Sequence, residues 1–148
     1  MDIEVRILGA DDGAVLARVA PEVFDNPVDA RWSAEFLADA RHHLAIAIDD
    51  GTVVGMASAV HYVHPDKPPE LWINEVGVAP THQGRGIAKR LLQALFARGR
   101  ELGCAEAWVL TESENTAARR LYAAAGGEES AAVMVSFHLL PSGETDGS

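Results

Sequence analysis

The sequence is short of cysteine, of aromatic residues and of long apolar runs. One cysteine, Cys104, occurs among 148 residues, which excludes a disulfide within the chain. No run of about eighteen apolar residues is present, so we expect no membrane-spanning helix. The opening residues alternate charged and apolar side chains, unlike a signal peptide. These features together indicate a cytoplasmic protein.

Basic charge is also scarce. Lys and Arg number 12 against 22 Asp and Glu, which gives a net charge of −10. Binding to nucleic acid depends on a basic face, so we expect no nucleic-acid partner. The acidic excess is compatible with solubility alone or with a field that attracts a cationic substrate, and charge by itself does not choose between them.

Apolar residues make up 48% of the chain, enough for one compact core at this length. We expect one domain over residues 1–140 and a flexible, polar tail over 141–148. Ser33 can cap the second helix. Trp32 and Phe24 are expected to pack in the core, and the alternative is that they form a wall of the substrate site. Periodicity predicts strands at 3–8, 44–49, 52–63, 71–78, 105–110 and 133–139, and helices at 12–19, 34–39, 87–101 and 115–125.

The central stretch of the chain reads as a strand, a glycine turn and a helix. Gly84 and Gly86 permit backbone angles that side chains resist, and they let an anion approach the unpaired amides of the helix start. Arg85, Lys89 and Arg90 add positive charge there. The local chemistry suits a pyrophosphate, and the alternative is a plain strand-to-helix turn. The spacing fits neither a P-loop nor the G-x-G-x-x-G dinucleotide fingerprint.

Two motifs carry a family resemblance. Gln83-Gly84-Arg85-Gly86-Ile87-Ala88 resembles the Q/R-x-x-G-x-G/A signature of the GNAT acyltransferase superfamily. Asn115-x-x-Ala118-x-x-Leu121-Tyr122-x-x-x-Gly126 resembles the second signature of that superfamily, except that Gly127 stands where an aromatic residue is usual. The resemblance covers the second half of the chain by motif and the first half by element order.

The resemblance implies the GNAT fold, acetyl-coenzyme A (acetyl-CoA) as co-substrate and no metal. That fold is a central, twisted, mixed and mostly antiparallel sheet flanked by helices, with a V-shaped splay between the fourth and fifth strands. His61 and His64 are spaced like metal ligands, but no Cys or acidic ligand cluster accompanies them, so we expect no zinc site.

The resemblance also implies residue roles. The main chain of Val76 and Val78 would meet the acetyl and pantetheine arm, and Asn115 would hydrogen-bond the pantetheine. Tyr122 would protonate the departing thiolate as general acid, and the alternative is that Leu121 and Tyr122 only form a buried helix face. The residues implied to surround the pyrophosphate are Gln83, Gly84, Arg85, Gly86, Ile87, Ala88 and Lys89.

An amine acceptor attacks the thioester directly only as its free base, so a group must remove its proton. Glu75 is the candidate general base because GNAT enzymes often carry an acidic residue at that position. The alternative is an ordinary solvated carboxylate. Other candidates for the base are His61, Glu70 and Asn74, acting directly or through water.

Within the superfamily, the chain resembles the aminoglycoside 3-N-acetyltransferases in its Asn74–Val78 strand after a proline-rich loop, its length and its short final strand. This resemblance implies a polycationic aminosugar as acceptor, a role in antibiotic resistance and a possible homodimer. The alternatives are another acceptor, such as a polyamine, an amino acid or a protein lysine, or a non-catalytic domain that binds CoA as a sensor.

Overall fold

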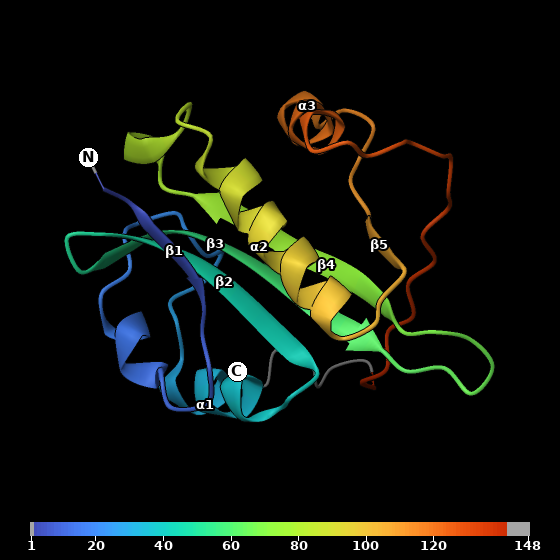
Figure 1. Ribbon diagram of the computed structural model, residues 1–148, viewed down its shortest axis with the longest axis horizontal. Helices are drawn as coiled ribbons and strands as arrows, with labels where there is room; N and C mark the ends of the chain where they lie inside the picture. Colours follow the sequence, from blue (N-terminus) through green and yellow to red (C-terminus); the bar gives the residue numbers. More distant parts are fainter. Residues whose placement is uncertain (1, 142–148) are drawn as a thin grey trace.

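A computed structural model describes residues 2–141 of the chain; the expected tail falls almost entirely outside them. Five strands follow one another in the order expected from the sequence, with helices after β1, β4 and β5 (Figure 1). The strands are β1 (Glu4–Ile7), β2 (His42–Asp49), β3 (Thr52–Tyr62), β4 (Glu70–Val78) and β5 (Glu106–Val109). The helices are η1 (Gly13–Ala17), α1 (Ala30–Ala38), η2 (Pro80–His82), α2 (Ile87–Glu101) and α3 (Thr116–Ala124), where η denotes a 3-10 helix.

The five strands form one sheet in sequence order, which confirms the expected mixed, mostly antiparallel arrangement. Neighbouring strands from β1 to β4 pair antiparallel, whereas β4 and β5 pair parallel. The turn between β2 and β3 is the expected two-residue hairpin, with Asp50 and Gly51 both at positive φ. The parallel crossover from β4 to β5 passes through α2, which lies across one face of the sheet (Figure 1).

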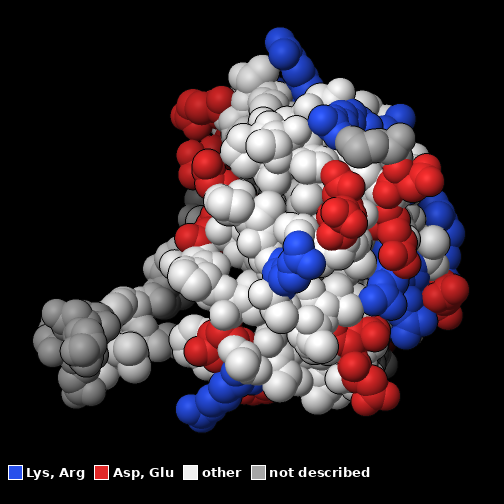
Figure 2. Space-filling model, turned by 90° about the vertical axis from the view of Figure 1, so that its left-hand side faces the viewer, with Lys and Arg blue, Asp and Glu red and all other residues white. Residues whose placement is uncertain are grey.

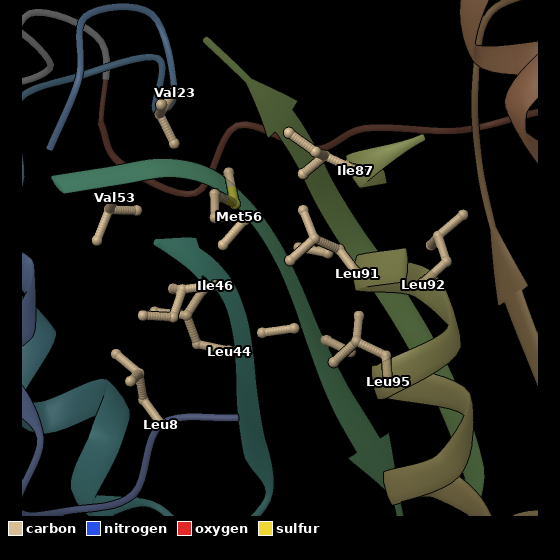
Figure 3. Close-up of a cluster of buried hydrophobic side chains, with 14 of the residues drawn as sticks. Leu8, Val23, Leu44, Ile46, Val53, Met56, Ile87, Leu91, Leu92 and Leu95 are labelled. Carbon is tan, nitrogen blue, oxygen red and sulfur yellow. The ribbon is translucent and has the colours of Figure 1, made fainter. Parts of the chain in front are cut away.

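Helix α2 buries one apolar stripe against the sheet, as its spacing predicts. Ile87, Leu91, Leu92 and Leu95 are almost fully buried, and Ile87, Leu91 and Leu95 point from the helix toward β2 and β3 (Figure 3). Each such side chain contributes about 1.5–3 kcal/mol when it leaves water. Gly55 of β3 permits this approach, because a Cβ there would lie 3.2 Å from both Ile87 and Leu91.

The opposite face of the sheet is covered by α1, η1 and the loop at residues 21–28. Leu44 and Ile46 of β2 turn toward that face, and Val23 of the loop joins the same buried cluster (Figure 3). The loop crosses β4 closely at Gly77, where any Cβ would collide with the carbonyl oxygen of Val23. This contact fixes the loop over the half of β4 that extends beyond β5.

A bulge in β4 decides which side chains face the loop. Ala59 pairs with Ile73 and the preceding residue Ser58 pairs with Glu75, so Asn74 is the extra residue. Ile73 lies on the α2 face, and without the bulge Glu75 would share that face. The extra residue turns Glu75 toward the loop at 21–28 instead.

Two helices differ from their predicted bounds. The helix predicted at 34–39 begins at Ala30, and Asp29, rather than Ser33, is its N-cap, since the Asp29 side chain accepts a hydrogen bond from the Trp32 amide. The helix predicted at 12–19 is the short 3-10 helix η1. The side chain of Trp32 is 71% exposed, so its predicted place in the core is wrong.

The strand predicted at 133–139 is also wrong. These residues form no strand or helix, and the side chains of Val133, Phe137 and Leu139 are at least 80% exposed. The segment runs apart from β5 at the edge of the sheet (Figure 1). Alternating apolar residues favour a strand only when a neighbouring strand supplies hydrogen bonds and buries one face, and neither occurs here.

The surface is of mixed charge. On the face turned to the viewer in Figure 2, Lys and Arg side chains stand as separate groups between acidic ones. Within residues 2–141, no helix is long and apolar enough to cross a membrane. No group of three or more His, Cys, Asp and Glu side chains in this range is arranged to hold a metal ion.

Candidate active site

The glycine turn between β4 and α2 is built as the sequence predicts. Gly84 and Gly86 have φ of 80° and 75°, in the left-handed region that favours glycine. Among the described residues, no heavy atom outside the turn lies within 4 Å of the position a Cβ would take at either glycine. The turn therefore presents its main chain to open space in front of the helix.

The start of α2 suits an anion. Gly86 is its N-cap, and no side chain of the described residues caps the helix there. The first turn contains no acidic residue, while Arg85 and Lys89 are exposed beside it. Amides without partners and the positive end of the helix dipole both favour negative charge. The Ile87 side chain is buried in the core, so at this residue only main-chain atoms face the turn.

Beyond its pairing with β5, β4 has a free edge. The parallel pairing ends at Ile73 with Val109, yet β4 continues to Val78. The Ala79 amide bonds to the Val54 carbonyl on β3, whereas the Val78 carbonyl accepts a hydrogen bond from Gln83 Nε2 at 3.1 Å. Val78 thus turns its main chain away from β3, and the alternation of a strand gives Val76 the same direction. This separation is the V-shaped splay expected of the fold.

Glu75 lies on the face of β4 opposite α2, where Asp25 from the loop at 21–28 is close enough to raise its pKa. Burial is the largest cause that raises the pKa of Glu75, followed by the negative charge of Asp25 and by hydrogen bonding with that carboxyl group. Asp25 and Phe24 also line a cavity of about 500 Å³ formed by residues 16–28. A carboxylate with a raised pKa beside a second carboxylate and a cavity can bind a cation and accept its proton.

Helix α3 supplies the other predicted residues. Asn115 is its N-cap, and the Asn115 Oδ1 atom accepts a hydrogen bond of 3.1 Å from the Ala118 amide. The side-chain amide group of Asn115 retains its two donors for another partner. Tyr122 is half-buried against the core, and burial raises the pKa of its hydroxyl. The phenol therefore carries its proton at neutral pH, as a general acid requires.

Three aromatic rings stack across β3, β4 and β5 where β4 and β5 are still paired. The ring centroids of Tyr62 and Trp72 are 5.8 Å apart, those of Trp72 and Trp108 are 5.1 Å apart, and both pairs are nearly parallel at 15°. Trp108 Nε1 donates to Glu70 Oε1 at 3.3 Å. The stack fastens β5 to β4 immediately before the two strands separate.

Residues 14–126 match the acetyltransferase (GNAT) family, which is well over half of the chain. The chain belongs to this family. The acetyltransferase is 36% identical over 98 residues to the aminoglycoside N(6′)-acetyltransferase type 1 of Salmonella typhimurium strain LT2, covering 62% of this chain and 68% of that one. It is 32% identical over 124 residues to the L-2,4-diaminobutyric acid acetyltransferase of Streptomyces coelicolor strain A3(2), covering 82% and 72%.

Solved structures agree with this assignment. An aminoglycoside acetyltransferase from an uncultured soil metagenomic sample, in complex with trehalose, superposes with a TM-score of 0.80 over 94% of this chain and 97% of that one, and at 18% identity it shows the fold alone. The aminoglycoside N-acetyltransferase AAC(6′)-Iy in complex with CoA is 26% identical, with a TM-score of 0.72 and coverage of 93% and 95%. The acetyltransferase thus has the expected GNAT fold.

Two of the three alternative candidates for the base, His61 and Glu70, have other side-chain partners in the acetyltransferase. His61 Nδ1 lies 2.8 Å from His43 Nε2, and His61 pairs in register with Leu71, which contacts α2 at Gly99. His61 therefore lies on the α2 face, opposite Glu75. Glu70 accepts the Trp108 hydrogen bond and pairs with Lys67 at 3.4 Å.

Sequence reasoning missed two contacts of this site. The Asp25–Glu75 pair joins a loop to a distant strand, and His82 Nε2 lies 2.7 Å from Asp49 Oδ2 between η2 and the end of β2. Neither pair has a fixed spacing or a motif in the sequence. Only the register of the strands and the path of the loop bring these residues together.

Proposed function

We propose that this acetyltransferase transfers the acetyl group of acetyl-CoA to a primary amine of an aminoglycoside. The observation that carries the proposal is the position of Glu75. It lies beside Asp25 in the part of β4 beyond Ile73, where the edge of β4 that faces away from β3 has no paired strand among the described residues. The acetyl group of the co-substrate can therefore approach this part of β4 along its free edge, while a cationic amine approaches from the face that carries Glu75 and Asp25. Relatives named for aminoglycoside acetylation support the acceptor class.

The residues around the glycine turn fit acetyl-CoA. The amides at Gly84, Arg85, Gly86, Ile87 and Ala88, with Lys89 nearby, would hold its diphosphate, while Gln83 fixes the end of β4 through the Val78 carbonyl. The main chain of Val76 and Val78 would hydrogen-bond the pantetheine arm as an added strand does. The amide group of Asn115 remains available to the same arm. Acetyl-CoA supplies the activated acyl group for direct attack in a ternary complex.

The acceptor chemistry follows from the carboxyl pair. An aminoglycoside amine arrives mostly as an ammonium ion, which the Asp25–Glu75 pair would attract. Glu75 would then take the proton, and the free amine would attack the acetyl carbonyl. Tyr122 would donate a proton to the departing thiolate of CoA, and the second proton that the nitrogen loses on forming the amide would replace it on Tyr122. No net redox change occurs, and one C–S bond is exchanged for one C–N bond.

The acetylated position is a separate question. The sequence favours the 3-amino group, whereas the named relatives are N(6′) enzymes, which favours the 6′-amino group. The diaminobutyric acid relative favours a second candidate acceptor, a small diamino acid. Each of these acceptors presents a second cationic group near the reacting amine, so the Asp25–Glu75 pair suits all of them.

The test is thiol release from acetyl-CoA with sisomicin, neamine and L-2,4-diaminobutyric acid, followed by mass spectrometry and NMR of the product. We expect turnover with the aminoglycosides and acetylation at the 6′ or the 3 position. Turnover confined to the diamino acid would overturn the aminoglycoside assignment. Calorimetric binding of CoA without turnover of any amine would favour the sensor alternative.

A further inference from the structure

A chain of three side chains links the glycine turn to the far end of the β2–β3 hairpin. His82 Nδ1 lies 2.8 Å from Thr81 Oγ1, and His82 Nε2 lies 2.7 Å from Asp49 Oδ2. His82 ends η2, directly before Gln83 and the turn, whereas Asp49 is the last residue of β2. The side chains of His82 and Asp49 are only 15% and 22% exposed, so water competes weakly for the contact.

The geometry fixes how the imidazole is used. A carboxylate only accepts hydrogen bonds, so His82 Nε2 must carry a proton and donate it to Asp49. In the neutral ring, Nδ1 then accepts from the Thr81 hydroxyl, and in the charged ring it donates to the same oxygen. The Thr81–His82–Asp49 chain is therefore satisfied in either protonation state of the ring.

The glycine turn needs such support. Gly84 and Gly86 give the turn many alternative conformations, and ordering them costs free energy that binding must offset. Within residues 80–86 of the described chain, the other side-chain hydrogen bonds, from Gln83 to Val78 and from Arg85 to Thr81, stay inside the β4–α2 connection. The His82–Asp49 bond is the one that reaches a different strand.

We propose that His82 and Asp49 are positioning residues that hold the glycine turn in the shape that binds the CoA diphosphate. The inference rests on the proposed use of CoA. The pair touches neither substrate: it anchors η2, and η2 sets where the turn begins. Holding the turn in place before binding reduces the entropy lost when CoA binds.

The direction of the change in CoA affinity when Asp49 is removed distinguishes an anchoring role from a purely electrostatic effect. Asp49 places a negative charge near a site for an anion, so its removal by charge alone would tighten CoA binding. As an anchor, its removal loosens the turn and weakens CoA binding. The two readings therefore predict opposite changes for Asp49→Ala.

The experiment compares His82→Phe, Asp49→Ala and the double variant with the wild type by calorimetry with CoA and by steady-state kinetics. We expect each single variant to bind CoA about tenfold more weakly, the effect of losing one charge-assisted hydrogen bond. The double variant should be little worse than either single one, because both remove the same contact. The KM for acetyl-CoA should rise while kcat changes less than about twofold.

Two further variants and one cofactor-free measurement complete the test. Asp49→Asn keeps an oxygen that accepts from His82 and should restore most of the affinity. Asp50→Asn removes the neighbouring charge without touching His82 and should leave CoA affinity unchanged or slightly tighter. Amide hydrogen exchange at residues 80–86 without CoA should be faster in His82→Phe and Asp49→Ala than in Asp50→Asn.

The outcomes are distinguishable from those of the proposed function. If the wild type binds no CoA, the proposed function fails first. If the wild type binds CoA and Asp49→Ala binds equally well or better, the anchoring role is refuted while the proposed function stands. Lower melting temperatures of the His82 and Asp49 variants with unchanged CoA affinity would likewise reduce the pair to a structural contact.

Discussion

The carboxyl group of Glu75 on β4 lies beside that of Asp25 in the loop at 21–28, close enough for Asp25 to raise its pKa. The pKa of Glu75 is raised by burial first and by Asp25 second. The pKa of Glu75, the proposed base, therefore depends on the position of the loop that carries Asp25 and lines the adjacent cavity.

Asp25→Asn should move the pH dependence of kcat/KM for the amine. Glu75 acts as a base only when ionised, so its pKa sets the rising acidic limb of the profile. Without the charge of Asp25 that pKa falls, and the limb should shift to lower pH while the KM for a polycationic acceptor increases. The control is Asp11→Asn, an exposed carboxylate away from the cavity. An acidic limb identical to that of the wild type would mean that another group is the titrating base.

Tyr122→Phe should lower kcat by roughly ten- to a thousand-fold, because it deletes the proton donor for the thiolate while keeping the ring. The ring remains half-buried, so calorimetry should give a nearly unchanged CoA affinity. The matched control is Tyr62→Phe, which removes a phenol hydroxyl from the stacked rings. Wild-type turnover in Tyr122→Phe would remove this residue from the role of general acid.

Comparing Gly86→Ala with Gly103→Ala should separate the loss of stability caused by backbone strain from the loss of CoA binding. Both glycines have positive φ and open space around the missing Cβ, one at the start of α2 and one after its end. Each substitution should cost roughly 1–2 kcal/mol of stability in chemical denaturation. Only Gly86→Ala should weaken CoA binding, by about tenfold or more, since its methyl group enters the space before the helix amides. Equal CoA affinities in the two variants would argue that the diphosphate binds elsewhere.

His43 should make the fold sensitive to acid. Burial, and then the charge of His61, lowers the pKa of His43 from 6.5 to about 4. Between about pH 4 and pH 6.5, His43 therefore binds a proton in the unfolded chain but not in the folded chain. Stability should be fully present above pH 6.5 and should fall by up to about 3 kcal/mol as the pH drops to about 4. Denaturation across this range should show a flatter dependence for His43→Gln than for the wild type or for His138→Gln, an exposed control.

Local patterns in the sequence predicted the parts of the site that are local in the structure. The turn at Gly84 and Gly86, the buried stripe of α2 and the hairpin at Asp50–Gly51 each depend on neighbouring residues, and the structure confirms them. The start of α1 was missed because Asp29 and Ser33 are both suitable caps. Only the actual path of the chain decides between them.

Contacts between segments that are distant in the chain could not be predicted from the sequence. The strand expected at 133–139 has the right alternation but lacks a paired neighbour, which no local pattern supplies. The side of the sheet on which Glu75 lies depends on one extra residue, Asn74, and nothing in the residue types there marks a bulge. Hydrogen bonds such as that between Asp49 and His82 follow from these same long-range choices.

The stack of Trp72 on Trp108 has a practical consequence. The two indoles bridge β4 and β5 at the point from which the strands diverge, so any change in that divergence alters how the rings overlap. Exposed Trp32 is the third tryptophan of the chain, and its replacement by phenylalanine leaves a single coupled pair of indoles. The near-ultraviolet circular dichroism of this indole pair should therefore report a change in the separation of β4 and β5 without an attached dye.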